Sequence, residues 1–262
     1  MTRTFRAELI KLRRRRVAIA MTVSALAFAV IATTLVFLSA TSAGEPGAQR
    51  GATVESLGQA GGATEAFSIG VSFVGILVLV LFIANFAGEF SQGTFRTLLM
   101  RQPRRIGLLA GKLGALLAFA AVGLALAEIL TVAASAAIAP SQDVSTASWL
   151  GIDGLGEAAV DYAKALFGIA AWASLGMALA IFVRSIPVAL AIGIVWSGPF
   201  EHLLDDAWST AGQWFPGLLL EALAAGGTAD VSSTRALTLV AGYVAVAVSA
   251  AAIVFARRDI TS

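Results

Sequence analysis

Residues 67–87 read FSIGVSFVGILVLVLFIANFA, and no side chain in this stretch carries a charge. A helix of about 20 residues rises about 30 Å, which is the thickness of the hydrocarbon layer of a bilayer. The stretch therefore predicts a helix that crosses a membrane. The next segment, GEFSQGTFRTLLMRQPRRIGLLAGK at residues 88–112, is of a different kind, because it mixes Arg and Lys with Gly, Phe and Leu.

The composition of the whole chain indicates that lipid is its main solvent. Of the 262 residues, 58% are hydrophobic and 13% are charged, whereas about a quarter of the residues in a soluble domain are charged. The chain has no cysteine and one histidine, His202, so the sequence offers no thiolate nucleophile, histidine triad or zinc ligand set. We predict neither a catalytic residue nor a metal site, and we expect His202 to be an exposed loop residue.

Further apolar runs predict an all-α integral membrane protein with six transmembrane helices. The spans are expected at about residues 17–38, 67–87, 111–138, 159–183, 186–200 and 236–256. The fifth is short, but Pro187 suits the first turn of a helix, where a missing N–H costs nothing, so we expect a true helix that begins at Ile186. The first run is longer than the apolar region of a signal peptide, about 7 to 15 residues, and we interpret it as an uncleaved span.

The distribution of charge predicts the orientation of these spans. If both termini are cytoplasmic, all of the 18 Lys and Arg residues except Arg50, Lys164 and Arg235 lie on the cytoplasmic side, as the positive-inside rule requires. The loops on the opposite side carry most of the Asp and Glu. We expect a multi-pass protein of the inner, cytoplasmic membrane of a cell. Topology and anionic lipid explain the basic runs, so no nucleic acid is expected as a partner.

The N-terminal segment TFRAELIKLRRRR is predicted to lie along the membrane rather than across it. Phe5, Leu9 and Leu12 share one face of a helix, and basic residues surround this apolar stripe. Such a pattern is typical of an amphipathic interfacial helix, which we expect over residues 3–15.

Residues 201–234, before the last span, are too long for a plain connection. Their apolar runs are too short to span, and they are accompanied by Trp208, Trp214 and Phe215. Because aromatic rings favour the membrane interface, we expect one or two short interfacial or re-entrant helices on the outer side.

Residues 88–112 are predicted to form a cytoplasmic loop that contains a short amphipathic helix. Its Phe and Leu residues supply apolar contacts and its Arg residues supply charge, which suits a helix on a membrane surface or on another protein. Gly93 and Thr94 are expected to end the preceding helix and to start the new one, with Thr94 as N-cap. The alternative is that these are ordinary positive-inside charges without a further role.

The sequence GLLAGKL at the end of this loop does not fit a phosphate-binding loop. The pattern G-x-x-x-x-G-K-[ST] needs more residues between the two glycines than Gly107 and Gly111 leave, and Leu113 lacks the hydroxyl that the pattern places after the lysine. Any ATP that drives this protein is therefore expected on another chain.

The order of residues after the second span resembles the cytoplasmic loop of the ABC type-2 permease family. The similarity rests on Glu89, Gly93, Thr94, Arg96, Leu99, Pro103, Arg105 and Lys112. The basic N-terminal segment, Pro216 before the last span and the closing FARRDI are also similar to features of the family. The likeness extends over nearly the whole chain.

This resemblance implies the membrane subunit of an ATP-binding cassette exporter for a hydrophobic or amphipathic substrate. Two such permease subunits, identical or paired with a similar chain, would form the pathway. Two copies of a separate ATPase would bind ATP and Mg²⁺, so the chain itself is expected not to be an enzyme and to hold no cofactor. The residues expected to couple to the ATPase are Glu89, Gly93, Thr94, Arg96, Arg101, Arg105 and Lys112.

Two ionisable residues are expected within the membrane. Glu128 lies deep in the third span, where an ionised carboxylate needs a partner or water, and it is a candidate for lining the pathway. Lys164 is expected either to reach toward Glu128 or to extend outward beside Asp161 and Glu157. On the fifth span, small residues recur every four positions and permit close helix contact: Ala189, Gly193 and Ser197.

Two other classes of function compete with the permease. An ion-coupled secondary carrier would use Glu128 as its proton or sodium group, but no internal inverted repeat accompanies it. A membrane enzyme or an assembly scaffold has less support, because no nucleophile, metal cluster or large soluble domain is visible in the sequence. The sequence does not identify the substrate.

Overall fold

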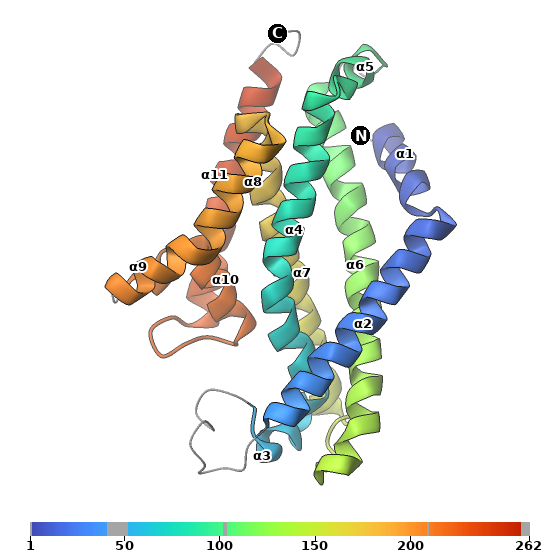
Figure 1. Ribbon diagram of the computed structural model, residues 1–262, viewed down its shortest axis with the longest axis vertical. Helices are drawn as coiled ribbons and strands as arrows, with labels where there is room; N and C mark the ends of the chain where they lie inside the picture. Colours follow the sequence, from blue (N-terminus) through green and yellow to red (C-terminus); the bar gives the residue numbers. More distant parts are fainter. Residues whose placement is uncertain (1, 41–51, 102–103, 209, 258–262) are drawn as a thin grey trace. The chain divides into compact units, whose positions relative to one another are not determined.

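A computed structural model of the chain describes residues 2–40, 52–101, 104–208 and 210–257 (Figure 1). The regular elements of these ranges are helices. They are α1 (Thr2–Leu12), α2 (Arg15–Ser39), α3 (Val54–Leu57), η1 (Ala60–Ala63), α4 (Glu65–Ser91), α5 (Thr94–Arg101), α6 (Arg105–Ile138), η2 (Ala139–Gln142), α7 (Ile152–Val183), α8 (Ile186–Val195), η3 (Trp196–Phe200), α9 (Glu201–Ala207), η4 (Ala211–Gln213), α10 (Pro216–Ala224) and α11 (Ser233–Arg257).

Within the described ranges, six helices are long and apolar enough to cross a membrane, which confirms the predicted all-α fold with six spans. Hydrocarbon forces this choice, because a backbone in lipid must satisfy its own hydrogen bonds. Two helices begin earlier than the apolar runs suggest: α6 starts at Arg105 and α7 at Ile152. A formed helix gains a hydrogen bond for each residue that it adds, so it continues past the end of its apolar run.

The N-terminal segment and the segment before the last span both contain helices. At the N-terminus, α1 ends at Leu12, so it is shorter than the helix expected over residues 3–15, and the first span, α2, already starts at Arg15. Before the last span, η4 and α10 occupy part of residues 201–234, and α9 continues the fifth span to Ala207.

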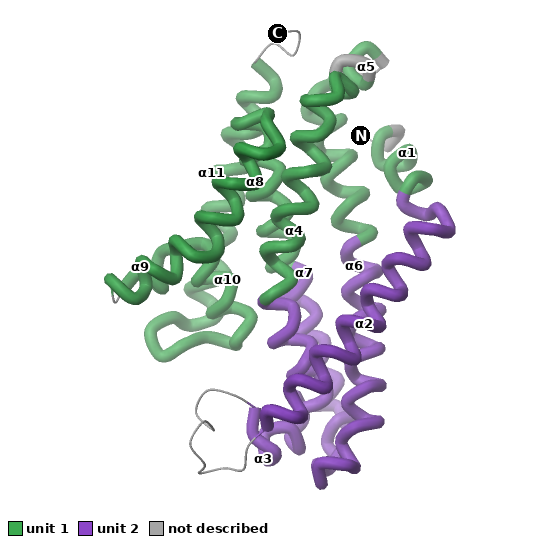
Figure 2. The backbone as a smooth tube through the Cα atoms, viewed as in Figure 1, with its two compact units in different colours: residues 1–11, 73–119, 167–262 green, residues 12–72, 120–166 purple. Residues whose placement is uncertain are grey.

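The chain divides into two compact units (Figure 2). Unit 1 consists of residues 1–11, 73–119 and 167–262, and unit 2 consists of residues 12–72 and 120–166. One boundary falls at the end of α1, and the other three fall inside α4, α6 and α7, so each of these three helices contributes one part to each unit.

In unit 1, glycines let α4 approach α7 and α8 closely. A Cβ atom on Gly176 of α7 would meet the carbonyl oxygen of Leu79 at 2.9 Å, and one on Gly193 of α8 would meet Ile83 at 2.9 Å. At Gly176 a larger side chain would push against the backbone of α4, whereas at Gly193 it would displace the end of the Ile83 side chain. Close approach of this kind is how membrane helices gain packing energy when lipid already surrounds their apolar side chains.

The fifth span places its predicted small residues on a buried face. Ala189 is fully buried, Ser197 is 4% exposed, and the Ser197 hydroxyl donates a hydrogen bond to the carbonyl of Gly193 at 2.6 Å. The helix contains a π turn, η3, with Pro199 inside it. Proline has no N–H to donate, so a widened turn at this point disturbs fewer hydrogen bonds than a regular one would.

Directly after the π turn, Glu201 binds the first turn of α10. The side chain is 1% exposed, and its Oε2 accepts a hydrogen bond from the N–H of Leu218 at 3.0 Å. A carboxylate is favourable there because the free N–H groups and the helix dipole both attract negative charge. Gly217 makes room for it, since a Cβ on this residue would collide with the same oxygen.

Other contacts position the segment between α9 and α11 in unit 1. Tyr243 of α11 donates its hydroxyl to the carbonyl of Trp214 at 2.8 Å, and α10 packs on α11. His202 is exposed, but it lies in α9 rather than in a loop, and its Nε2 is 3.6 Å from Oε1 of Glu221.

In unit 2, the segments that join the spans form a small core of their own. Trp149 is 3% exposed, and its indole N–H donates to the carbonyl of Leu57 at 2.9 Å. The side chains of Thr53 and Ser56 cap α3 reciprocally. Leu57 and Trp149 pack with Phe37 at the end of α2, so this core is continuous with a spanning helix.

We predict that Glu201→Ala destabilises the protein, because the first turn of α10 loses its hydrogen-bond acceptor. Loss of a helix cap costs about 1–2 kcal/mol, and the unfolding midpoint of the purified protein in detergent measures it. The matched control is Asp206→Ala, an exposed acid on the same helix, for which we expect a change within about 0.5 kcal/mol. Equal effects of the two substitutions would contradict the capping role.

Candidate functional site

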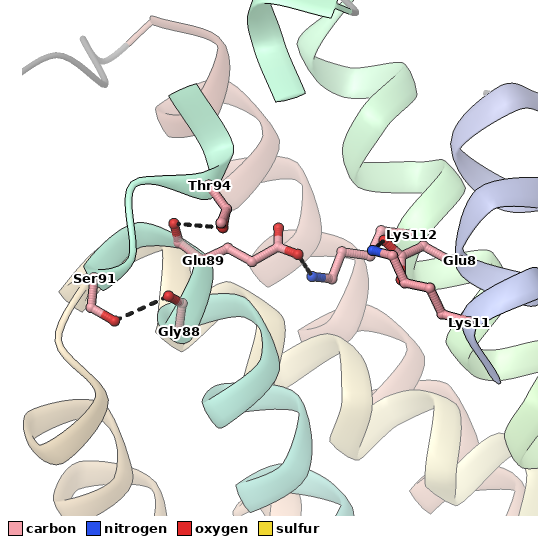
Figure 3. Close-up of polar contacts among 7 residues, drawn as sticks. All are labelled: Glu8, Lys11, Gly88, Glu89, Ser91, Thr94 and Lys112. Carbon is pink, nitrogen blue, oxygen red and sulfur yellow. Dashed lines mark hydrogen bonds and ion pairs between the residues drawn. The ribbon is translucent and has the colours of Figure 1, made fainter. Parts of the chain in front are cut away.

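The connection from α4 to α5 is a tight turn at Gly93. This residue has a φ of 67°, a left-handed conformation that glycine adopts without strain. The Thr94 hydroxyl donates to the carbonyl of Glu89 at 3.2 Å, and the Ser91 hydroxyl donates to the carbonyl of Gly88 at 3.0 Å (Figure 3). The hydroxyl of Thr94 thus bonds back to the end of α4 rather than acting as the expected cap of α5. The turn is therefore held by hydrogen bonds to the last turn of α4.

An aromatic cluster anchors α5 to two spanning helices. Phe95, in the first turn of α5, is fully buried. Its ring centroid lies 4.5 Å from that of Phe90 on α4 and 5.3 Å from that of Phe255 on α11. The Phe90 and Phe255 rings also meet edge to face. Such geometries are favourable for aromatic pairs, so α5 is attached to both helices.

A buried ion pair joins α4 to α6 beside this cluster. The ammonium group of Lys112 pairs with Oε1 of Glu89, and the two side chains are 2% and 17% exposed (Figure 3). The Lys112 ammonium also lies 4.9 Å from the ring centroid of Phe86, a cation–π contact. The sequence places Lys112 at the end of a loop, whereas the structure places it inside α6, because that helix already begins at Arg105.

Glu8 of α1 is a second acid near Lys112, and it is not among the residues predicted for this site. It is 8% exposed, pairs with Lys11 at 2.8 Å, and lies close enough for its charge to act on Lys112 (Figure 3). Glu8 is the only acid in the otherwise basic segment before the first span. That isolation is the signal by which the sequence marks it.

Two arginines lie near the aromatic cluster and contact the ends of helices in unit 1. Arg105 donates from Nη1 to the carbonyls of Phe255 and Ala256, both at 3.3 Å, where α11 ends. Arg184 comes directly after α7, and its guanidinium lies 5.2 Å from the ring centroid of Phe90. Cations at helix C-termini offset the negative end of the helix dipole.

The remaining predicted residues of this segment lie on α5 and just after it. Arg96 and Arg101 belong to α5, but their side chains lie outside the part that the structure describes, as does Pro103. Leu99 is half-buried, while Met100 is 74% exposed. One side of α5 is therefore attached to the protein and the other faces outward.

In unit 2, the structure does not bring Glu128 and Lys164 into an ion pair. Lys164 instead lies 3.5 Å from Oδ1 of Asp161, one turn away on α7. The other oxygen of Asp161 accepts a hydrogen bond from Thr64 at 2.7 Å. Among the described residues, the buried Oε1 of Glu128 has no hydrogen-bond partner.

Six helices of the described ranges are long and apolar enough to span a membrane, and a short helix, α5, is anchored where α4 and α11 end and α6 begins. These features indicate a multi-pass membrane protein. A family model described as ABC-2 family transporter protein matches residues 4–199. The match covers most of the chain, so the protein belongs to this family, as the loop residues predict. The same comparisons found no matching curated protein and no matching solved structure.

We predict that Glu89 and Lys112 stabilise the fold as a coupled pair, so that the effects of replacing them are not additive. Lys112→Met leaves a largely buried carboxylate without its partner, which costs about 3–5 kcal/mol. Glu89→Gln combined with Lys112→Met removes both charges and is expected to cost clearly less than the sum of the two single changes. Unfolding midpoints of the purified variants measure this coupling.

Lys11→Met is the control for this experiment, because the Lys11 side chain is 57% exposed, whereas that of Lys112 is 2% exposed. Water screens the charge of an exposed lysine, so we expect a loss of about 0–1 kcal/mol. Strict additivity of the Glu89 and Lys112 substitutions would show that the pair carries no coupling energy.

Proposed function

We propose that the protein is the permease subunit of an ATP-binding cassette transporter and that α5 receives the motion of a separate ATPase. The observation that carries this proposal is the attachment of α5. Phe95 binds it to α4 and α11, and the Glu89–Lys112 pair ties α4 to α6 directly beside it. A push on the outward side of α5 would move these helices together, because packed interiors deform little.

The proposed assembly has two permease subunits, identical or similar, and two copies of the ATPase. ATP and Mg²⁺ would be bound by the ATPase, since GLLAGKL lacks the phosphate-binding pattern. The positive-inside rule supports an inner membrane protein whose termini and α5 face the cytoplasm. One subunit with six spans offers too little wall to enclose a pathway that opens alternately to each side, which supports a dimer.

Export of a hydrophobic or amphipathic substrate is the direction that we propose for this transporter. The support is the resemblance of residues 88–112 to exporter permeases, together with membership of the ABC-2 family. The coupling surface would be the exposed side of α5 with Met100 and the neighbouring Arg104.

We predict that Met100→Cys crosslinks to the ATPase in the assembled transporter. The chain has no cysteine, so one introduced thiol reacts at one place, and Met100 is exposed enough to tolerate the change. With a short linker that carries a maleimide at one end, which reacts with the introduced thiol, and a photoreactive diazirine at the other, which inserts into any neighbouring residue, we expect a permease–ATPase adduct on a denaturing gel.

Leu150→Cys is the matched control for crosslinking. Leu150 is 78% exposed and is expected on the outer side of the membrane, so it should give no adduct. A complex that hydrolyses ATP but yields no adduct from Met100→Cys, or that yields one from Leu150→Cys, would refute the proposed docking surface.

The ion-coupled carrier is the competing function, and the unpartnered oxygen of Glu128 is the observation in its favour. The two functions predict different behaviour of Glu128→Gln in vesicles. We expect this variant, together with the ATPase and at saturating substrate, to retain ATP-dependent transport without an ion gradient. Gradient-driven uptake by the unmodified chain alone, lost in Glu128→Gln, would show that the carrier is the correct class.

A further inference from the structure

A groove lies between α6 and α7 within unit 2. Glu128, Ile129 and Val132 line it from α6, and Leu155, Ala159 and Tyr162 line it from α7. Its volume is about 460 Å³, within the range of about 300–1,000 Å³ that small-molecule sites occupy. The walls are almost entirely apolar, and Glu128 is the one carboxylate among them.

The polar groups of this groove differ in how they are satisfied. Tyr162 donates its hydroxyl to the carbonyl of Ala121 at 3.0 Å, so it is already engaged. The Oε1 atom of Glu128 is buried and has no hydrogen-bond partner among the described residues. An unsatisfied buried acceptor is costly, and a ligand that brings a donor removes that cost. The last torsion of a Glu side chain is soft, so the carboxyl can turn either oxygen toward such a ligand.

The charges around the groove favour a cation. Asp161 lies near enough to act on Glu128, and Glu65 lies near Asp161 and Lys164. The ammonium of Lys164 is held by Asp161 at 3.5 Å. Three acidic side chains and one ammonium thus lie in this part of unit 2, and the ammonium is paired with Asp161 rather than with Glu128. An anionic ligand would be repelled, whereas a cation would gain an opposite charge in an apolar setting.

We propose that this groove binds hydrophobic cations, with an ammonium group on Glu128 and an apolar chain along Ile129, Val132 and Leu155. A charge-assisted hydrogen bond would hold the ammonium group, and the open apolar walls would remove the chain from contact with water or lipid headgroups. The groove then selects amphiphiles by the sign of their charge. This inference rests on the proposed function in one respect only: it names such cations as the substrate class of the exporter.

The test uses the full chain in phosphatidylcholine nanodiscs, without ATPase or ATP. Three photoreactive decyl probes of equal length carry an amine, an alcohol or a carboxylate, and mass spectrometry identifies the labelled peptides. We expect saturable labelling of α6 and α7 by the amine at about tenfold lower concentration than by the alcohol, and least labelling by the carboxylate. Glu128→Gln should reduce the affinity for the amine to that for the alcohol.

Two further variants make the result specific. Glu157→Gln removes an exposed acid of α7 that does not line the groove, and it should leave labelling unchanged. Leu155→Trp fills the groove at a position that is 60% exposed and so tolerates a larger side chain. It should reduce amine and alcohol labelling alike, which keeps the test decisive if Glu128→Gln does not fold.

Equal labelling by the three probes would overturn the proposal and identify the groove as a lipid contact only. Unchanged amine labelling in Glu128→Gln, or in Leu155→Trp, would overturn it as well. Because the ATPase is absent, failure of the proposed coupling at α5 would not affect this outcome. A complex with normal ATP-dependent transport and no selective amine labelling would refute the proposal that the groove binds cations and would leave the proposed permease function intact.

Discussion

Hydrocarbon neither donates nor accepts hydrogen bonds, and this constraint accounts for most of the structure. It forces the six apolar stretches into helices, and it leaves each charged side chain near lipid with the need for a partner. Glu89 has Lys112, Glu201 has the first turn of α10, and Asp161 has Thr64 and Lys164. The partnered acids hold helices together, because each of them joins an element to another or fixes its own turn.

Glu128 and α5 differ from these partnered acids for opposite reasons. Glu89, Glu201 and Glu128 each have one buried oxygen without a hydrogen-bond partner in the described part of the chain. Glu89 and Glu201 are held through their other oxygen, whereas Glu128 lines an open groove and is suited to bind a ligand. On α5, by contrast, Phe95 is buried against α4 and α11, while Met100 faces outward. The proposed transporter needs both features. The anchored helix α5 would transmit the motion of the ATPase, and the carboxyl group of Glu128 would bind the substrate.

The spans could be predicted from the sequence because apolar length alone decides them, whereas the contacts of charged residues could not. Lys112 looks like a loop residue, since its burial depends on Glu89 and Phe86 on another helix. Arg105 contacts carbonyls at the far end of the chain, which no local pattern encodes. The pair between Lys164 and Asp161 is local, and their spacing of one helical turn anticipates it. Glu201 is inconspicuous in sequence, because its role depends on where α10 begins.

The π turn in the fifth span also sets the rotational phase of the helix beyond it. Positions four residues apart drift by about 40° around a regular helix, so Ala189, Gly193, Ser197 and Glu201 would not stay on one face. A turn closed by i→i+5 hydrogen bonds advances less per residue and reduces this drift, and all four residues are buried. Removing one residue from the turn would rotate Glu201 by about 100°, away from the helix that it caps, without altering any side chain of the cap itself.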